Sequence, residues 1–171
     1  SIILAANGAT ATAEADASNK SDRPIVGAIR WDAWHGDASS VGLTVEQTMA
    51  PKHWHYRLPF FGKVVGENAV EARGHTQEVV DQEIAYAADA GLDYWAFVIY
   101  PPEEALSLGL QLYLSSAHKH RINFCLDLQG GWEGRDGMKA WPERIERYLR
   151  LFREPTYQTV LDGRPLVYLY S

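Results

Sequence analysis

Apolar residues in this chain fall into short continuous runs that alternate with stripes of helical spacing. Four runs are short enough to be strands, and they span residues 24–31, 92–100, 122–128 and 165–170. A strand buried on both faces of a parallel sheet is apolar along almost its whole length, as residues 92–100 are. The pattern therefore predicts four strands of a parallel sheet.

Three segments between these runs have the spacing of amphipathic helices. In residues 76–90 the apolar side chains recur on one face, Thr76 can cap the first turn, and Gly91 can end the helix in a left-handed turn. Residues 106–120 carry the second stripe. Residues 142–152 carry the third, with a predicted core face of Ile145, Tyr148, Leu149 and Phe152.

This alternation predicts an α/β fold with parallel strands and right-handed crossovers. Two architectures fit it: the N-terminal half of a (β/α)8 barrel of the TIM type, or a small open doubly wound sheet. No glycine-rich phosphate loop follows any run, which disfavours a nucleotide-binding open sheet. A complete barrel needs about 250 residues, whereas this chain has 171. Asp162-Gly163 adds an ambiguity, because this turn could close a hairpin over residues 159–168 instead of leading into a strand.

Two segments lie outside the repeat. Residues 1–23 begin with a short apolar stretch and continue with small and polar residues, so we expect either a signal-peptide remnant or a disordered leader. A signal peptide would make the protein secreted or periplasmic. Residues 38–74 are irregular but too aromatic for a solvated linker, and we expect a functional loop or a small excursion with its own packing. Residues 24–171 then form the partial barrel domain.

Composition narrows the possible partners. The net charge is −6 and no basic stripe is present, so we expect no nucleic-acid partner. No stretch is long and apolar enough to span a membrane. The spacing of His53 and His55 is not that of a metal site, and we expect neither a metal nor a cofactor. Aromatic residues make up 12% of the chain, which suits either sugar stacking or ordinary core packing.

Candidate binding residues follow from the position of sites in parallel α/β folds, which bind ligands beyond the carboxyl ends of the strands. Aromatic rings and acids gather at these ends. A carbohydrate has apolar C–H faces and many hydroxyl groups, so such a set favours sugar binding. The predicted substrate-binding residues are Trp31, Asp32, His35, Tyr100, Asp127 and Trp132.

Five short motifs, in this order along residues 24–170, resemble the WbsX-like or glycoside hydrolase family 99-like proteins. The segment beginning at Ala90 and the turn beginning at Asp162 are the most specific. The motifs are VGAIRW from residue 26, TQEVVDQEI from residue 76, AGLDYWAF from residue 90, INFCL from residue 122 and DGRPL from residue 162.

The resemblance implies a (β/α)8 barrel that cleaves glycosidic bonds, related to endo-acting α-mannosidases. The catalytic glutamates of that family lie in the second half of the barrel, to which nothing in this chain corresponds. No catalytic residue is therefore assigned. By position at strand ends, the resemblance implies that Trp31, Asp32, Tyr100, Asp127 and Trp132 line the sugar-binding end.

Three functions follow as expectations. The first is part of a glycoside hydrolase that acts on an oligo- or polysaccharide, with its catalytic acids outside this chain, so that the isolated chain is inactive. The second is a non-catalytic carbohydrate-binding or assembly module, and the third a protein associated with polysaccharide biosynthesis. A four-stranded arc would leave both edge strands unpaired, so we also expect a homo-oligomer or association with the missing barrel half.

Overall fold

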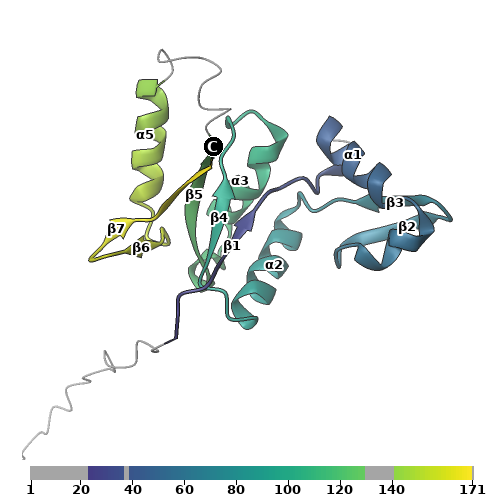
Figure 1. Ribbon diagram of the computed structural model, residues 1–171, viewed down its shortest axis with the longest axis horizontal. Helices are drawn as coiled ribbons and strands as arrows, with labels where there is room; N and C mark the ends of the chain where they lie inside the picture. The colour runs from purple at the N-terminus through teal and green to yellow at the C-terminus, as the bar shows by residue number, and fades with distance from the viewer. Residues whose placement is uncertain (1–22, 37–38, 130–140, 171) are drawn as a thin grey trace, which may run out of the picture.

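A parallel four-stranded sheet forms the centre of the computed structural model, which describes residues 23–36, 39–129 and 141–170 (Figure 1). Every pair of neighbouring strands in this sheet is parallel, so the predicted parallel α/β fold is confirmed. The strand order follows the chain without reversal: β1 (Gly27–Arg30), β4 (Tyr94–Val98), β5 (Asn123–Gln129) and β8 (Val167–Tyr170).

The register of the sheet determines which side chains share a face. Arg30 lies opposite Phe97, Phe97 opposite Leu126, and Leu126 opposite Val167, so these four residues form one row across the sheet. Side chains in such a row project to the same side, and each strand alternates between the two sides. We call the side of this row the helix face and the other side the open face.

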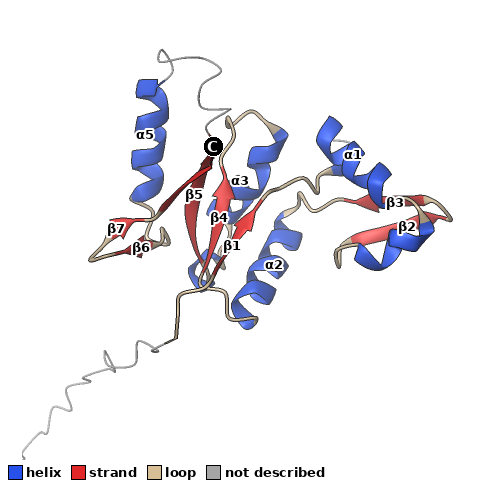
Figure 2. Ribbon diagram, viewed as in Figure 1, coloured by secondary structure: helices blue, strands red, loops and turns tan. Residues whose placement is uncertain are grey.

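Three helices pack against the helix face: α2 (Gln77–Asp89), α3 (Leu108–Ser115) and α5 (Trp141–Phe152). Tyr113 of α3 lies 5.5 Å from Phe97 and 5.3 Å from Phe124 between ring centroids. Phe152 of α5 reaches the same face through Tyr157, whose ring lies 5.0 Å from Phe124. In Figure 2, α3 lies behind the strands. Burial of each such aromatic side chain contributes about 1.5–3 kcal/mol, so these contacts hold the helix layer on the sheet.

The helices follow the predicted pattern with two differences. Thr76 caps α2 by accepting a hydrogen bond from Val79 N–H, and Gly91 follows the helix with a φ of 83°, as the sequence indicates. The second helix ends at Ser115 rather than at residue 120, because Ser116 is extended and a separate 3-10 turn follows. In the third helix, Leu149 is exposed and Leu151 is buried, so the predicted core face was wrong at Leu149.

Residues 38–74 contain an excursion with its own secondary structure, one of the two alternatives that the sequence allowed. Its elements are α1 (Ser40–Met49), the 3-10 helix η2 (Lys52–Arg57), and a hairpin of β2 (Gly62–Gly66) with β3 (Ala69–Ala72). Glu46 of α1 accepts a hydrogen bond from the Ala72 backbone at 2.8 Å, which ties the helix to the hairpin. The helix was not predicted, because Gly42, Thr44 and Thr48 give it weak propensity.

The last strand and the hairpin both exist, although the sequence presented them as alternatives. The chain runs beside β5 at Tyr157, leaves in the hairpin of β6 (Thr159–Val160) and β7 (Arg164–Pro165), and returns to pair with β5 as β8. Its turn has positive φ values of 45° at Leu161, 62° at Asp162 and 94° at Gly163. The hairpin therefore interrupts the last strand rather than replacing it.

On the open face, Tyr94 contacts both edge strands of the sheet. The ring of Tyr94 on β4 lies over Gly27 of β1, where a Cβ atom would be only 2.1 Å from the Cζ atom of Tyr94. The hydroxyl group of the same tyrosine is 2.6 Å from the hydroxyl group of Tyr168 on β8. In a flat sheet, β1 and β8 would be roughly 14 Å apart, three spacings of about 4.8 Å. Tyr94 therefore contacts the backbone of one edge strand and a side chain of the other, so we infer that the sheet bends toward this face.

The substitution Gly27→Ala tests this packing. The added methyl group overlaps the Tyr94 ring, so we expect the free energy of unfolding to fall by about 1–3 kcal/mol, the usual cost of overpacking. Urea denaturation measures the change. Gly66→Ala is the control, because its added Cβ atom meets only the Ala69 side chain at 3.3 Å. A loss that persists unchanged in a Tyr94→Leu background would show that the ring is not the cause.

Candidate functional site

The residues beyond the carboxyl ends of β1, β4 and β5 form two groups on opposite faces of the sheet. Arg30, with Asp32 beyond the end of β1, belongs to the helix face and forms a group with Glu83 of α2, which we call the ion cluster. Trp31 belongs to the open face and forms a group with Tyr100 and Asp127, which we call the open-face site. The alternation of side chains along β1 separates the two groups.

The ion cluster is centred on the guanidinium group of Arg30. Its Nε atom donates to Asp32 Oδ1 at 2.8 Å, and its Nη2 atom donates to Glu83 Oε2 at 2.7 Å. The guanidinium carbon also lies 4.5 Å from the ring centroid of Trp95 and 5.5 Å from that of Phe97. The side chain of Arg30 is only 13% exposed. Two carboxyl groups and two aromatic faces therefore replace water around a buried cation.

Burial dominates the titration of this cluster. It raises the pKa of Asp32 and of Glu83, although the positive charge of Arg30 acts in the opposite direction on both. Burial lowers the pKa of Arg30, but the two carboxyl groups more than offset this, and the net direction is upward. The nearby imidazole of His35 has a lowered pKa, again mainly because of burial. The cluster therefore favours a charged arginine and retains protons on its acids to a higher pH than usual.

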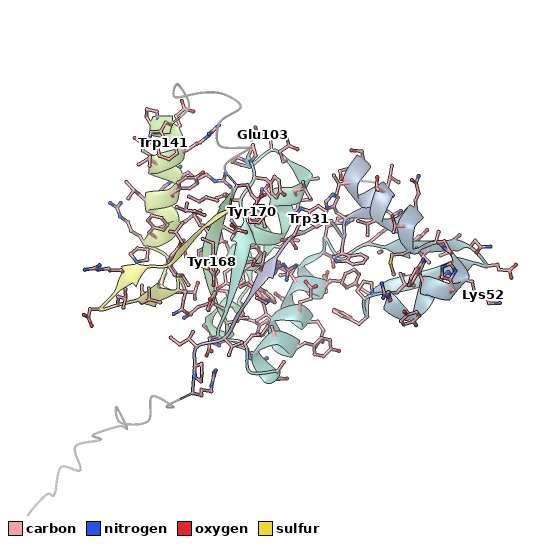
Figure 3. The ribbon with its side chains drawn as sticks, in the orientation of Figure 1. Trp31, Lys52, Glu103, Trp141, Tyr168 and Tyr170 are labelled. Carbon is pink, nitrogen blue, oxygen red and sulfur yellow. The ribbon has the colours of Figure 1, made fainter. Side chains whose placement is uncertain are left out.

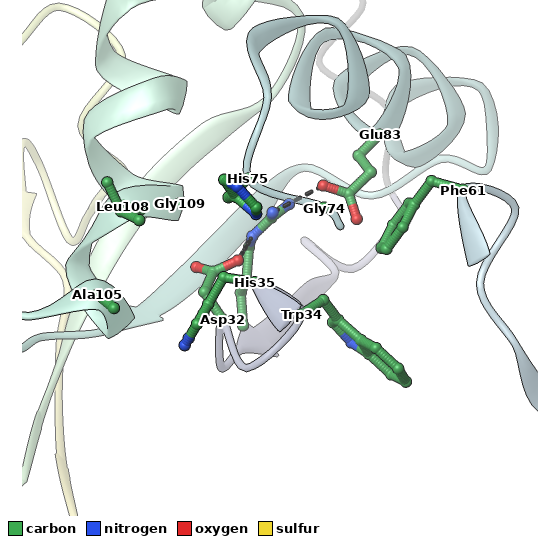
Figure 4. A pocket seen from close by; sticks show the side chains of 11 residues that line it. Asp32, Trp34, His35, Phe61, Gly74, His75, Glu83, Ala105, Leu108 and Gly109 are labelled. Carbon is green, nitrogen blue, oxygen red and sulfur yellow. Dashed lines mark hydrogen bonds and ion pairs between the residues drawn. The ribbon is translucent and has the colours of Figure 1, made fainter. Parts of the chain in front are cut away.

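A small cavity adjoins the ion cluster (Figure 4). It measures about 20 Å³ and so accommodates about one water molecule, far too little for a sugar ring. His35 and His75 line it, and His35 forms a hydrogen bond to Ser39 that fixes its ring. Gly109 of α3 lets the Asp32 carboxyl group approach, because a Cβ atom there would lie 2.1 Å from Asp32 Oδ2. This geometry indicates a structural role for the cluster.

The open-face site has the opposite character. Trp31 Nε1 donates to the hydroxyl oxygen of Tyr100 at 2.9 Å, which fixes the orientation of an indole ring whose residue is 50% exposed. Figure 3 labels Trp31, Tyr168 and Tyr170, and the two tyrosines, on the same face of β8, are exposed as well. Burial raises the pKa of Tyr100, and the charge of Asp127 adds to this effect. Tyr100 thus stays a neutral hydroxyl that accepts from Trp31.

Asp127 is the unusual residue of the open-face site. It is 2% exposed, and its Oδ1 atom has no hydrogen-bond partner among the described residues. Among the same residues, its Oδ2 atom receives one long contact, of 3.4 Å from Gln129 Nε2. An unsatisfied buried polar atom costs about 1–3 kcal/mol, so native structures rarely retain one without a reason.

The structure divides the residues that the sequence proposed. Trp31, Tyr100 and Asp127 come together on the open face, whereas Asp32 and His35 lie beside the ion cluster and its small cavity. Trp132 lies outside the described residues. Sequence reasoning missed Arg30, Glu83 and His75. Arg30 gave a usable signal, because a charge that ends an apolar run must find a partner. Glu83, within a regular helix, gave none.

Comparison with models of protein families, with characterised proteins and with solved structures finds no match to this chain. Among the described residues, no helix is both long and apolar enough to cross a bilayer, and no cluster of three histidine, cysteine or acidic side chains could hold a metal ion. The case for a function therefore rests on the geometry of the open-face site and on the motifs in the sequence.

Removing both acids of the ion cluster tests its structural role. Asp32→Asn and Glu83→Gln each leave Arg30 with one carboxyl partner, so we expect small losses in the free energy of unfolding. The double variant leaves a buried cation without one, and we expect a loss of about 3–5 kcal/mol. Glu146→Gln, on the exposed face of α5, is the control. If urea denaturation shows that the loss in the double variant is small and equals the sum of the two single losses, the structural role of the ion cluster is contradicted.

The same variants have a predicted pH dependence. Because the folded pKa of Asp32 is raised, the folded state holds its proton more tightly, and stability from this group falls as pH rises from the unfolded pKa near 4 through the folded value. Asp32→Asn lacks this loss. The stability of the wild type relative to Asp32→Asn should therefore decrease as pH rises above about 4.

Proposed function

We propose that this chain forms half of a (β/α)8 barrel and provides part of the carbohydrate-binding cleft of a glycoside hydrolase. The catalytic acids come from outside residues 1–171. The open-face site supplies the main support, because it combines an exposed indole ring with a buried carboxyl oxygen that no described residue satisfies. The resemblance of five ordered motifs to the glycoside hydrolase family 99-like proteins points to the same activity.

Three features of the sheet support the half-barrel. The strands follow one another in chain order, whereas a doubly wound sheet reverses its order at a switch point. The helices α2, α3 and α5 pack on one face, as in a barrel, rather than on both. The contacts of Tyr94 with Gly27 and Tyr168 bend the sheet toward the open face, which would become the barrel interior.

The chemistry of the open-face site suits a sugar. An aromatic ring stacks on the apolar face of a pyranose, and Trp31 offers such a ring at the rim of the site. A sugar hydroxyl group could donate to Asp127 Oδ1, which has no hydrogen-bond partner among the described residues. A bound sugar would thus stack on the Trp31 ring and donate a hydrogen bond to Asp127 Oδ1.

The same site is insufficient for hydrolysis. A glycosidase uses two carboxyl groups, about 5–10 Å apart, across the scissile bond. Among the described strand residues of the open face, Asp127 is the only one with a carboxyl group. Asp32 is no substitute, since it is held by Arg30 on the helix face. A second acid would have to come from elsewhere, in keeping with the proposal.

The second candidate is a non-catalytic carbohydrate-binding or assembly module. The shortage of acids on the open face favours it as much as it favours half of an enzyme. A role in polysaccharide biosynthesis has less support, since the sequence has no glycine-rich loop for a nucleotide sugar. Binding and turnover measurements separate these functions.

Sugar titration followed by tryptophan fluorescence tests the open-face site. With α-mannan oligosaccharides as the first probe, we expect saturable quenching in the wild type. Asp127→Asn should weaken binding about tenfold, a loss of about 1.4 kcal/mol, which is typical of one hydrogen bond to a charged group. Asp162→Asn, in the exposed turn of the β6–β7 hairpin, is the matched control and should bind normally.

Trp31→Phe provides the second control, because it removes the reporter at the site and leaves the other five tryptophans. The quenching should disappear or fall sharply in this variant. Quenching that persists in Trp31→Phe, or binding that is unaffected by Asp127→Asn, would place the sugar elsewhere. A folded chain that binds no oligosaccharide counts against both candidate functions.

Turnover provides a separate test. We expect the 171-residue chain to release no product from aryl α-mannosides or mannan, because Asp127 is the one acid among the described strand residues of the open face. Product release can be followed by absorbance and by reducing-end assay. Hydrolysis that is abolished by Asp127→Asn or Asp32→Asn would show that the chain carries a complete catalytic pair.

A further inference from the structure

The excursion between β1 and α2 carries a cluster of aromatic rings and a cation on its short 3-10 helix, η2. Tyr56 is 75% exposed. The guanidinium carbon of Arg57 lies 4.6 Å from the ring centroid of Trp54 and 5.7 Å from that of Tyr56. The ring of His53 lies 4.7 Å from that of Trp54. We call these four residues the η2 surface.

The backbone and the neighbouring rings hold the η2 surface in place. The backbone N–H of Trp54 donates to the carbonyl oxygen of Pro51 at 2.8 Å, which fixes the first turn of η2. Just after η2, Phe60 packs edge-on against Tyr86 of α2, with 5.2 Å between the ring centroids. The surface is therefore anchored to the helix layer, and a ligand would meet rings that are already ordered.

The charge of this part of the chain is opposite to that of the whole. Residues 51–66 contain Lys52, Arg57 and Lys63 and no acid, whereas the complete chain has a net charge of −6. Lys52, at the outer end of the excursion in Figure 3, has a 3.8 Å contact with Glu67. Both of these side chains are more than 70% exposed, so the pair contributes little and neutralises little.

Arg57 is the cation that the structure prepares for a ligand. Its Nε atom donates to the Tyr56 hydroxyl oxygen at 3.1 Å, and no described carboxyl group lies within ion-pair distance of its guanidinium group. The two Nη atoms have no protein acceptor among the described residues. A planar guanidinium group held in this way matches the two oxygens of a carboxylate.

The excursion also leaves the sheet at the end where the proposed cleft lies. It connects β1 to α2 and so begins just after Trp31, the exposed ring of the open-face site. In parallel α/β barrels the connections at the carboxyl ends of the strands form the binding site. A polymer is long enough to contact both the cleft and a surface beside it.

We propose that the η2 surface binds an acidic polysaccharide, one whose sugar rings carry carboxylate groups. Tyr56 stacks on the apolar face of a pyranose ring, and the Nη atoms of Arg57 donate to the carboxylate of that ring or of its neighbour. That the ligand is a polysaccharide rests on the proposed function. Its acidic character rests on the charge of the η2 surface.

Other polyanions fit this surface less well. Nucleic acid is bound mainly by neutralising many phosphates, and three cations in a chain of net charge −6 neutralise few of them. An acidic peptide would satisfy Arg57 but offers no flat apolar face for the ring of Tyr56. A uronic acid combines both partners in one residue of the polymer.

Calorimetric titration of the 171-residue chain with oligogalacturonides tests the proposal. Neutral β-1,4-galactan oligosaccharides of the same length provide the matched ligand without carboxylates. We expect the acidic oligosaccharide to bind at least fivefold more tightly than the neutral one. Arg57→Gln and Tyr56→Ala should each weaken its binding about fivefold, as expected for one exposed ion pair or one ring contact.

Two variants serve as controls. Tyr56→Phe keeps the ring and should bind nearly as well as the wild type. Arg150→Gln makes the same change of charge at an exposed position on α5, where the side chain is 69% exposed, and should leave binding unchanged. Equal affinity for the two oligosaccharides, equal weakening by Arg150→Gln, or equally tight binding of poly-L-glutamate or of oligothymidylate would overturn the proposal.

The outcomes also separate this surface from the open-face site. A chain that binds mannan oligosaccharides through Trp31 and Asp127 but does not bind oligogalacturonides overturns the acidic ligand and leaves the proposed function standing. A chain that binds oligogalacturonides through Tyr56 and Arg57 but no mannan oligosaccharide supports the η2 surface and counts against the ligand proposed for the open-face site.

Discussion

Burial of the Arg30 guanidinium group determines which side chains at the end of β1 are available for a ligand. The strand places Arg30 under the helices, where Asp32, Glu83 and the rings of Trp95 and Phe97 surround it. A buried cation is stable only with such partners. Asp32 is thereby held on the helix face. Trp31, which lies between Arg30 and Asp32 in the sequence, points toward the open face.

The sequence predicted the framework well because the framework depends on local patterns. The four apolar runs became the four strands, Thr76 capped its helix, and Gly91 ended it. The helix α1 escaped prediction because tertiary contact with the β2–β3 hairpin, rather than propensity, holds it. The hairpin inside the last strand escaped for a different reason, since a turn signal does not specify whether the chain returns to the same neighbour.

The candidate site was predictable only in part. Its position at the strand ends follows from topology, and Trp31, Tyr100 and Asp127 were found in this way. The assignment of Asp32 and His35 to the same site was not supported, because two residues can follow one strand and still lie on opposite faces. The partner that draws Asp32 away, Arg30, is tied in turn to Glu83, which lies 53 positions away in the sequence. No local pattern contains such a contact.

The two acids at the strand ends illustrate how packing separates structural from functional roles. Asp32 has a charged partner at 2.8 Å and adjoins a cavity with room for about one water molecule. Asp127 is as deeply buried as the core, yet its Oδ1 atom has no partner among the described residues. A fold that tolerates an unsatisfied carboxyl oxygen, at a cost of about 1–3 kcal/mol, can recover that free energy when a hydroxyl group binds. The unsatisfied acid is therefore the better candidate for a ligand contact, and the satisfied one for stability.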